Sequence, residues 1–349
     1  MTTKNNLRFG VIGAGRIGKI HAENLATRIP SVEVAAIADV DLKCAQELAA
    51  RLHVPAAVDD YQVILSDPSI DAVAICSSTD THAKIVVEAA QAGNHIFCEK
   101  PIDYDLAKID AALEAVEKAS VKLQIGFNRR FDPNFRKVRT MIAEGKIGTP
   151  HIIRITSRDP APPPLSYVKV SGGMFFDMTI HDFDMARYLS GSEVEEVYAA
   201  VGVMVDPGIG EAGDVDTAVI MLRFANGVIG TIDNSRKAVY GYDQRVEVFG
   251  SQGMVQAHNN TPDNDVYFNA EGVHSAKPLH FFLERYMESF IAEQKEFVQS
   301  IREDTIPSVV GRDGRIPVLM GMAAKKSYLE NRPVKLSEIE HMSTQPIQS

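Results

Sequence analysis

The sequence predicts an α/β protein with a doubly wound parallel sheet, followed by an α+β domain with a large, open, mostly antiparallel sheet. A length of 349 residues, 45% of them hydrophobic and 23% charged, allows two domains with separate cores. The first 125 residues alternate short apolar strands with helical patterns, which is typical of a parallel sheet covered on both faces. The later strands are joined by turn signals instead. We expect domains at 1–125 and 126–335, and a mobile tail at 336–349.

A glycine-rich turn follows the first predicted strand, Leu7 to Ile12. The turn reads Gly13-Ala14-Gly15-Arg16-Ile17-Gly18 and opens a helical pattern. A G-x-G-x-x-G run between a strand and a helix permits a tight turn and brings a pyrophosphate close to the helix N-terminus. We therefore expect Gly13, Gly15, Arg16, Ile17 and Gly18 to bind a dinucleotide.

The second predicted strand, Val32 to Ala38, ends at Asp39. An acid at this place can accept hydrogen bonds from both ribose hydroxyls, and it repels a 2′-phosphate. The sequence therefore predicts NAD as the cofactor in preference to NADP. The alternative is that Asp39 only caps the helix that begins near Leu42.

The alternation of helices and strands continues to residue 125. We expect helices at 41–52, 60–66, 81–92 and 103–119, and strands at 70–76, 95–99 and 121–125. The polar loop from Ser77 to His82 lies at the same sheet edge as the glycine turn. Its Ser77, Ser78 and His82 either line the cofactor or form an ordinary helix cap.

The strand His95 to Cys98 ends in Glu99-Lys100-Pro101. Open α/β sheets bind ligands at the carboxyl edge of their strands, so Lys100 is a candidate for chemistry and Glu99 for cofactor contact. The alternative is a solvated strand end in which Pro101 starts the next helix. Farther on, Arg129 and Arg130 follow the last strand of this domain, where they either clamp substrate hydroxyls or pair with surface acids.

A second stretch with candidate catalytic residues begins at Asp177. If it is helical, residues advance by about 100° each, so Asp177, His181 and Asp184 share one face, and apolar residues anchor the other. A histidine beside a carboxylate is a general-base arrangement. The alternative is an ion pair that stabilises a surface helix. We expect no metal, because no third histidine lies at ligand spacing nearby.

The second domain contains three segments that read as strands, Thr217 to Phe224, Val228 to Asn234 and Arg245 to Phe249. Ala225-Asn226-Gly227 is a hairpin signal between the first two. Ala218 to Leu222 is apolar on both faces, so helices can cover one face and a partner subunit the other. A proline-rich segment after Asp159 is expected to form a rigid loop, because proline cannot join a sheet interior.

Charge and cysteine content exclude several classes of function. The formal net charge of −10 and pI near 5.5 argue against a surface for nucleic acid or anionic membrane. Three separated cysteines indicate neither a disulfide framework nor a thiolate zinc site. The polar N-terminus and the lack of a long apolar stretch predict a soluble, cytoplasmic protein.

Taken together, these motifs resemble the Gfo/Idh/MocA oxidoreductase family. The resemblance is carried by the glycine turn, Asp39, Cys98-Glu99-Lys100-Pro101, the run Gly126 to Asp132 and the stretch Asp177 to His181. Within the family, the chain is most similar to inositol dehydrogenases. The resemblance implies a Rossmann domain, NAD as cofactor, a cyclitol substrate such as myo- or scyllo-inositol, a homotetramer built on the sheet faces, and a cis peptide bond before Pro101.

The resemblance also assigns roles to individual residues. It implies that Lys100, Asp177 and His181 form the catalytic group, with His181 taking the hydroxyl proton while hydride passes to the nicotinamide. Substrate contacts are implied for Lys100, Arg129, Asp159, Met178, His181, Asp184, and Tyr240 or Tyr242; Arg129 is also expected near the cofactor. The alternatives are an aldose dehydrogenase, an NAD-dependent glycoside hydrolase, and a catalytically silent sensor of NAD or sugar.

Overall fold

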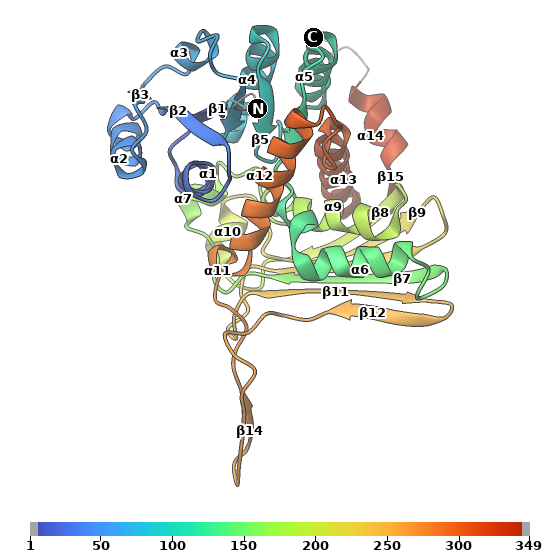
Figure 1. Cartoon of the computed structure of the whole chain (residues 1–349). Coiled ribbons are helices and arrows are strands. Elements are labelled where there is room, and N and C mark those ends of the chain that lie inside the picture. Colours follow the sequence, from blue (N-terminus) through green and yellow to red (C-terminus); the bar gives the residue numbers. More distant parts are fainter. Residues whose placement is uncertain (1–5, 344–349) are drawn as a thin grey trace. The chain divides into compact units, whose positions relative to one another are not determined.

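The computed structural model describes residues 6–343 and divides the chain into two compact units (Figure 1). The first unit comprises Met1–Phe131 and Glu288–Ile316, and the second comprises Asp132–Met287 and Pro317–Ser349. This division departs from a single boundary near residue 126. The reason is that the helix α12 (Met287–Arg302) returns to the first unit and contributes Phe297 and Val298 to its core.

The first unit is built on a parallel sheet, as the strand and helix alternation predicts. Its strand order is β3-β2-β1-β4-β5-β6, which is the doubly wound order with the switch between β1 and β4. The strands are β1 (Leu7–Ile12), β2 (Val32–Ala38), β3 (Ala56–Val58), β4 (Ala72–Ile75), β5 (His95–Cys98) and β6 (Leu123–Ile125). The strands β1 and β2 have the predicted bounds. The strand β3 was not predicted, because it is short and its sequence has no pattern typical of a strand.

Two helices of the first unit begin where a side chain satisfies a free backbone amide. Asp41 accepts a hydrogen bond from the amide of Lys43, and Asp105 accepts one from Ala107, so α2 and α5 start directly after these residues. The helices are α1 (Arg16–Thr27), α2 (Leu42–Leu52), α3 (Gln62–Leu65), α4 (Thr79–Ala92), α5 (Leu106–Ala119), the short 3₁₀ helix η1 (Asn128–Phe131) and α12. None of the helices within residues 6–343 has the length and apolar character needed to cross a bilayer.

Aromatic rings connect α12 to the parallel sheet. The Phe297 ring lies 6.1 Å from the ring of Phe9 in β1 and 6.1 Å from that of Phe97 in β5. All three side chains are fully buried. Burial of a phenylalanine contributes about 2 kcal/mol, so this contact is sufficient to hold a distant segment of chain against the sheet.

The second unit is built on a mixed sheet in the order β12-β11-β7-β10-β9-β8-β15. Only β7 and β10 pair in parallel, so the prediction of a mostly antiparallel sheet is confirmed. The hairpin signal at Ala225-Asn226-Gly227 joins β9 to β10. The strands are β7 (Pro150–Arg158), β8 (Val194–Gly202), β9 (Thr217–Phe224), β10 (Ile229–Ser235), β11 (Asp243–Gly250), β12 (Gly253–Ala257) and β15 (Val334–Lys335).

One face of this sheet is covered by helices of the same unit. The helix α9 (Thr179–Ser190) packs on β7 and β10, and α6 (Pro133–Ala143) packs against β12 (Figure 1). The other helices are α7 (Leu165–Val168), α8 (Met174–Asp177), α10 (Pro207–Glu211), α11 (Phe282–Arg285), α13 (Gly311–Glu330), which spans the division at residue 316, and α14 (Leu336–Ser343). Of the predicted tail, residues 336–343 therefore form a helix, and residues 344–349 lie outside the described part.

The opposite face of the sheet presents apolar side chains at alternating positions. These are Ile152 of β7, Val219 and Met221 of β9, Ile229 at the start of β10, Phe249 of β11 and Met254 of β12, each between 42% and 53% exposed. They share this face with the ion pairs Arg154–Glu247 and Arg223–Glu196. Several exposed apolar side chains on one sheet face are typical of an interaction surface. A separate hairpin, β13 (Val266–Asn269) with β14 (Gly272–Ser275), extends away from the sheet and is exposed throughout (Figure 1).

Asp132 anchors the start of α6. Its side chain accepts hydrogen bonds from the amides of Asn134 and Phe135, both at 3.0 Å, and it forms an ion pair with Arg285. Both members of the pair are buried, Asp132 completely. Burial takes water away from both charges, so each depends on the other for its stability.

We therefore expect Asp132→Ala to lower the free energy of unfolding by about 3–5 kcal/mol, because it leaves the Arg285 charge buried without its partner. The matched control is Asp105→Ala, which removes an exposed helix cap and costs about 1 kcal/mol. Urea unfolding followed by circular dichroism measures both. Equal shifts of the two midpoints would contradict a buried ion pair at Asp132.

Candidate functional site

The glycine turn has the shape that a dinucleotide requires. Gly13 has φ +103°, and a Cβ atom there would lie 2.5 Å from the carbonyl oxygen of Cys76 at the end of β4. A Cβ at Gly18 would collide with the carbonyl oxygen of Gly13. At Gly15, the N-cap of α1, a Cβ would meet nothing within 4 Å. The turn is thus closed toward the protein and open above the helix N-terminus, where a pyrophosphate binds.

Asp39 is fixed against this turn. Its Oδ2 accepts a 2.6 Å hydrogen bond from the amide of Ala14, and its Oδ1 accepts one of 2.9 Å from the amide of Asp41. The cap of α2 is Asp41, which removes the alternative that Asp39 only caps that helix. Each carboxylate oxygen still has a lone pair for a ribose hydroxyl. Arg16, exposed, and Ile17, partly buried, begin α1 beside the turn.

The loop between β4 and α4 connects two parts of the same sheet edge. His82 is buried, its Nδ1 lies 2.8 Å from the carbonyl oxygen of Pro101, and its Nε2 lies 3.0 Å from that of Ser77. Both ring nitrogens thus contact backbone carbonyls, so His82 connects this loop to the segment after Lys100. The hydroxyl of Ser77 is bonded to that of Thr81 at 2.7 Å, and Ser78 is exposed at the N-cap of α4.

Glu99, Lys100 and Pro101 follow β5 directly at the carboxyl edge of the sheet. The Lys100–Pro101 peptide bond is cis, as the resemblance predicts. Glu99 is 7% exposed, and its Oε1 lies 2.7 Å from Nε2 of the buried His21 in α1. Lys100 is partly exposed.

The two adjacent arginines differ in surroundings. Arg130 donates a 2.9 Å hydrogen bond to Asp313. Of the two alternatives for the arginines, pairing with an acid is therefore the one observed for Arg130. Arg129 is 5% exposed in η1. A buried guanidinium of this kind is held in a fixed orientation, which suits a binding residue.

In the second unit, polar side chains gather where β7 and β10 end. These strands are parallel, so their carboxyl ends lie at the same edge of the sheet. Asp159 follows β7 and Arg236 follows β10. The amide of Asp159 donates to the carbonyl of Ser235 at 2.9 Å, which keeps the two chain segments together beyond the last strand residues.

Arg236 is a site residue that the sequence analysis missed. It is 3% exposed and donates to Asp177 at 2.8 Å and to Asp159 at 3.4 Å. Burial by itself lowers the pKa of Arg236, but Coulomb attraction from Asp177 and Asp159 raises it above the ordinary value. The guanidinium therefore stays charged and holds two acids near each other. The available signal was an arginine just after a predicted strand; the parallel pairing that brings it to Asp159 is visible only in the structure.

The Asp177 to Asp184 stretch is not one continuous helix. Asp177 ends α8, α9 begins at Thr179, and the buried Met178 lies between them. Asp177 accepts a 2.8 Å hydrogen bond from the Tyr167 hydroxyl in addition to that from Arg236. The single helix on which the shared face of Asp177, His181 and Asp184 depended is therefore not formed, and Asp184 is 1% exposed.

His181 lies in the first turn of α9 and is partly exposed. Behind it, a buried network fixes the helix to the sheet. Asn234 of β10 donates a 2.9 Å hydrogen bond to Asp182, and the hydroxyl of Thr179 donates one of 2.6 Å to Asn234. The side chains that position His181 are therefore buried polar groups in good hydrogen-bond geometry.

The two tyrosines suggested for substrate contact lie in different surroundings. Tyr240 is 38% exposed, donates a 2.6 Å hydrogen bond to Asp243 and accepts one of 3.0 Å from Arg158. Tyr242 is 6% exposed and packs edge-on against the rings of Phe281 and Tyr286. Tyr242 is therefore a core residue, and Tyr240 is the one that solvent reaches.

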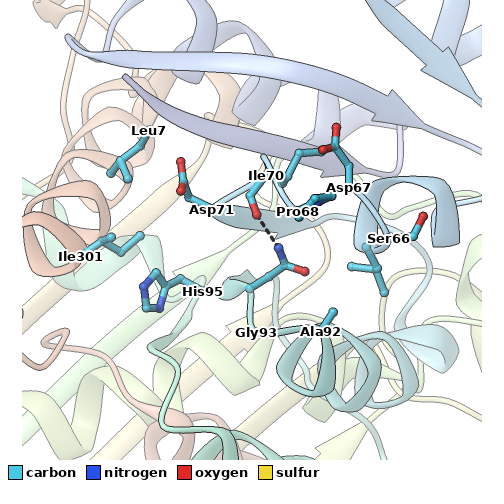
Figure 2. Close-up of a pocket in the computed structure, with 12 residues that line it drawn as sticks. Leu7, Ser66, Asp67, Pro68, Ile70, Asp71, Ala92, Gly93, His95 and Ile301 are labelled. Carbon is cyan, nitrogen blue, oxygen red and sulfur yellow. Dashed lines mark hydrogen bonds between the residues drawn. The ribbon is translucent and has the colours of Figure 1, made fainter. Parts of the chain in front are cut away.

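A cavity of about 470 Å³ in the first unit lies away from these groups (Figure 2). It is bordered by Leu7 at the start of β1, by Asp71 before β4 and by His95 at the start of β5. Since the sheet is parallel, these residues mark its amino edge, opposite the edge of the glycine turn and Lys100. Ligands of such sheets bind at the carboxyl edge, so this cavity is not the cofactor site.

Comparison with known proteins agrees with the geometry of both units. Residues 7–127 match the oxidoreductase family with an NAD-binding Rossmann fold, and residues 135–256 match the GFO/IDH/MocA C-terminal domain. The myo-inositol 2-dehydrogenase of Thermotoga maritima is 53% identical over 333 residues, which cover 95% of this chain and 99% of that protein. The inositol 2-dehydrogenase of Rhizobium meliloti is 43% identical over 332 residues, which cover 95% of this chain and 99% of that protein.

A solved structure extends the likeness to the fold and the cofactor. Scyllo-inositol dehydrogenase from Lactobacillus casei, with bound NAD(H) and scyllo-inositol, has a TM-score of 0.90 at 30% identity, covering 95% of this chain and 100% of that one. The open glycine turn and the placement of Asp39 fit the same cofactor. The chain therefore belongs to the Gfo/Idh/MocA oxidoreductases and is an NAD-dependent enzyme acting on CH–OH groups.

Proposed function

We propose that this enzyme oxidises one hydroxyl of a cyclitol, converting myo- or scyllo-inositol to the corresponding keto-inositol. The observation that carries this proposal is the cluster of Asp159, Arg236 and Asp177, the last of which stands four residues before the partly exposed His181. A polyol offers hydroxyls in several directions, and charged side chains held in fixed places can bind them specifically. Relatives named as inositol dehydrogenases support the same substrate class.

The proposed chemistry divides between the cofactor and the side chains. Bound NAD supplies the hydride acceptor. His181 takes the proton of the reacting hydroxyl as general base, and Asp177 stabilises the imidazolium that results. Lys100 donates a hydrogen bond to the reacting oxygen and stabilises its negative charge as it develops. No step in this mechanism requires a metal.

Arg236 keeps Asp177 in place for this task. It binds Asp177 through Oδ2, while the Tyr167 hydroxyl binds Oδ1. Two donors on opposite oxygens fix the plane of the carboxylate, and a fixed carboxylate can orient an imidazole. We assign Arg129, Asp159 and Tyr240 to substrate hydroxyls, with Met178 as an apolar wall. The buried Asp184 supports the helix and can reach a hydroxyl only through a change in side-chain position.

The first test combines a substrate screen with two substitutions. NAD reduction is measured with myo-inositol, scyllo-inositol and a set of aldoses. We expect turnover with an inositol, and we expect Lys100→Ala and His181→Ala each to lower kcat by about 10²–10⁴-fold, as is usual for loss of an acid–base group. Binding of NAD, followed by fluorescence, serves as the folding control. Turnover of aldoses only, or near-normal kcat in both variants, would contradict the proposal.

The second test concerns cofactor choice. We expect Asp39→Ser to weaken use of NAD and to permit use of NADP, because the substitution removes the ribose acceptor and the repulsion of a 2′-phosphate. The change in the ratio of kcat/KM for the two cofactors is expected to be about tenfold or more, equivalent to at least about 1.4 kcal/mol. Asp41→Ser removes a nearby exposed charge and should leave the ratio unchanged. An unchanged ratio in Asp39→Ser would show that Asp39 does not select the cofactor.

We also propose that the enzyme is a homotetramer assembled through the apolar face of the second unit's sheet. The face presents Val219, Met221 and Phe249 to solvent at 53%, 50% and 47% exposure. These side chains alternate with buried ones, so the same strands can bury their other face against helices. Covering the exposed face with a second copy would remove this apolar surface from water.

Sedimentation velocity tests this assembly. We expect the wild type to sediment as a tetramer, and Met221→Glu with Val219→Glu to sediment as a smaller species, since two charges would be buried at the interface. Ile306→Glu, at a site of 83% exposure in the first unit, is the matched control and should keep the assembly. A wild-type monomer at micromolar concentration would refute the proposal.

A further inference from the structure

A buried polar cluster in the first unit lies directly behind Lys100 and has no role in the proposed chemistry. It consists of His21 in α1, Glu99 after β5 and Glu293 in α12. Their polar atoms lie within 4.8 Å of one another. His21 and Glu293 are 0% exposed, and Glu99 is 7% exposed. Three segments far apart in the sequence thus converge on one point at the edge of the sheet.

Two hydrogen bonds hold His21 in this cluster. Its Nδ1 lies 3.0 Å from the side-chain amide of Gln294. Its Nε2 lies 2.7 Å from Oε1 of Glu99, and an ionised carboxylate can only accept, so Nε2 is the donor. His21 therefore orients the Glu99 side chain.

Glu293 is the unusual member. Both of its carboxyl oxygens are fully buried, and no donor of another described residue reaches them. Its neighbours include the carboxylate of Glu99, and two carboxylates this close in a buried place do not both ionise. Burial, followed by repulsion from Glu99, raises the pKa of Glu293 well above its usual value.

The other titratable groups nearby offer no compensating charge. The thiols of Cys76 and Cys98 are buried, and burial together with the charge of Glu99 raises the pKa of both. They are therefore neutral. Burial beside another carboxyl group therefore favours the neutral form of Glu293.

We propose that Glu293 is a neutral carboxylic acid that directs its proton toward Glu99, and that it is a positioning residue for Lys100. The protonation of Glu293 stands on the geometry of the first unit alone, whereas its effect on catalysis rests on the proposed function. The acid hydrogen gives Glu99 a second donor besides His21. A carboxylate held by two donors fixes the chain at the residue before Lys100.

The space around Glu99 leaves its carboxylate one direction in which to move if the hydrogen bond from Glu293 is lost. A Cβ at Gly126 would lie 3.0 Å from the carboxyl carbon of Glu99, so the carboxylate already fills the room on that side. Its side chain is 10% exposed, which leaves one direction open toward solvent. Without the Glu293 hydrogen, Glu99 can move in that direction and take Lys100 with it. A displacement of about 1 Å at a catalytic group can cost about 10²-fold in rate.

A divalent cation is the competing occupant of such a cluster. One imidazole and two carboxylates are a ligand set that zinc accepts, but binding requires both glutamates to be ionised. A neutral Glu293 and a bound cation therefore predict different protonation states of Glu293 and different metal contents of the protein. Both quantities can be measured on the wild-type protein without substrate.

The first experiment determines the protonation state. We expect the infrared spectrum of the wild-type enzyme near neutral pH to contain the carbonyl stretch of a buried carboxylic acid, absent in Glu293→Gln. Glu288→Gln, on the same helix but exposed, is the matched control and should keep the band. Absence of the band in the wild type, or about one equivalent of zinc or manganese by elemental analysis, would overturn the proposal.

The second experiment tests the positioning role. We expect Glu293→Met, which cannot donate, to lower kcat for inositol by about tenfold or more with little change in the KM for NAD, since the glycine turn is untouched. Glu293→Gln can still donate and should restore most of the lost kcat, which a requirement for an ionised carboxylate would not allow. Equal losses in both variants would refute the positioning role. If the wild type does not oxidise inositols, the proposed function fails, whereas the infrared result still decides the protonation of Glu293.

Discussion

Close approach of backbone to backbone at the glycine turn is the constraint on which the first unit depends. Gly13 leaves no room for a side chain against Cys76, and Gly18 leaves none against Gly13 itself. The end of β1 is therefore held against the end of β4, and α1 starts immediately beside both. That placement brings His21, one turn into α1, to the end of β5 and to Glu99. The same contact thus shapes the cofactor turn and supports the Lys100 segment.

Local sequence was sufficient for the parts of the site that form within one or two elements. The bounds of β1 and β2, the glycine turn and the place of Asp39 follow from a strand, a turn and a helix in succession. The hairpin between β9 and β10 follows from its turn residues. Such features depend on backbone geometry that the residue types themselves impose, so they can be predicted from sequence.

The remaining site residues depend on tertiary contacts that no local pattern contains. Glu293 reaches Glu99 only because α12 returns to the first unit, which the predicted boundary near residue 126 excluded. Arg236 meets Asp177 only because β10 pairs in parallel with β7. The helix from Asp177 onward, on which the shared face of Asp177, His181 and Asp184 depended, is interrupted at Met178, and helical periodicity does not reveal such a break.

The two polar clusters solve the problem of buried charge in different ways. In the second unit, one guanidinium forms ion pairs with both Asp159 and Asp177, and the mutual attraction offsets part of the loss of water around all three groups. In the first unit, the carboxyl groups of Glu99 and Glu293 lie close together, and the proposed proton on Glu293 removes one of two like charges instead. A guanidinium keeps its charge across the physiological range, whereas a carboxylic acid keeps its proton only while its surroundings stay dry. The dryness of the space between α1, β5 and α12 is therefore as much a part of this arrangement as the side chains themselves, and the aromatic contacts of His21 with Phe97 and Phe290 help to maintain it.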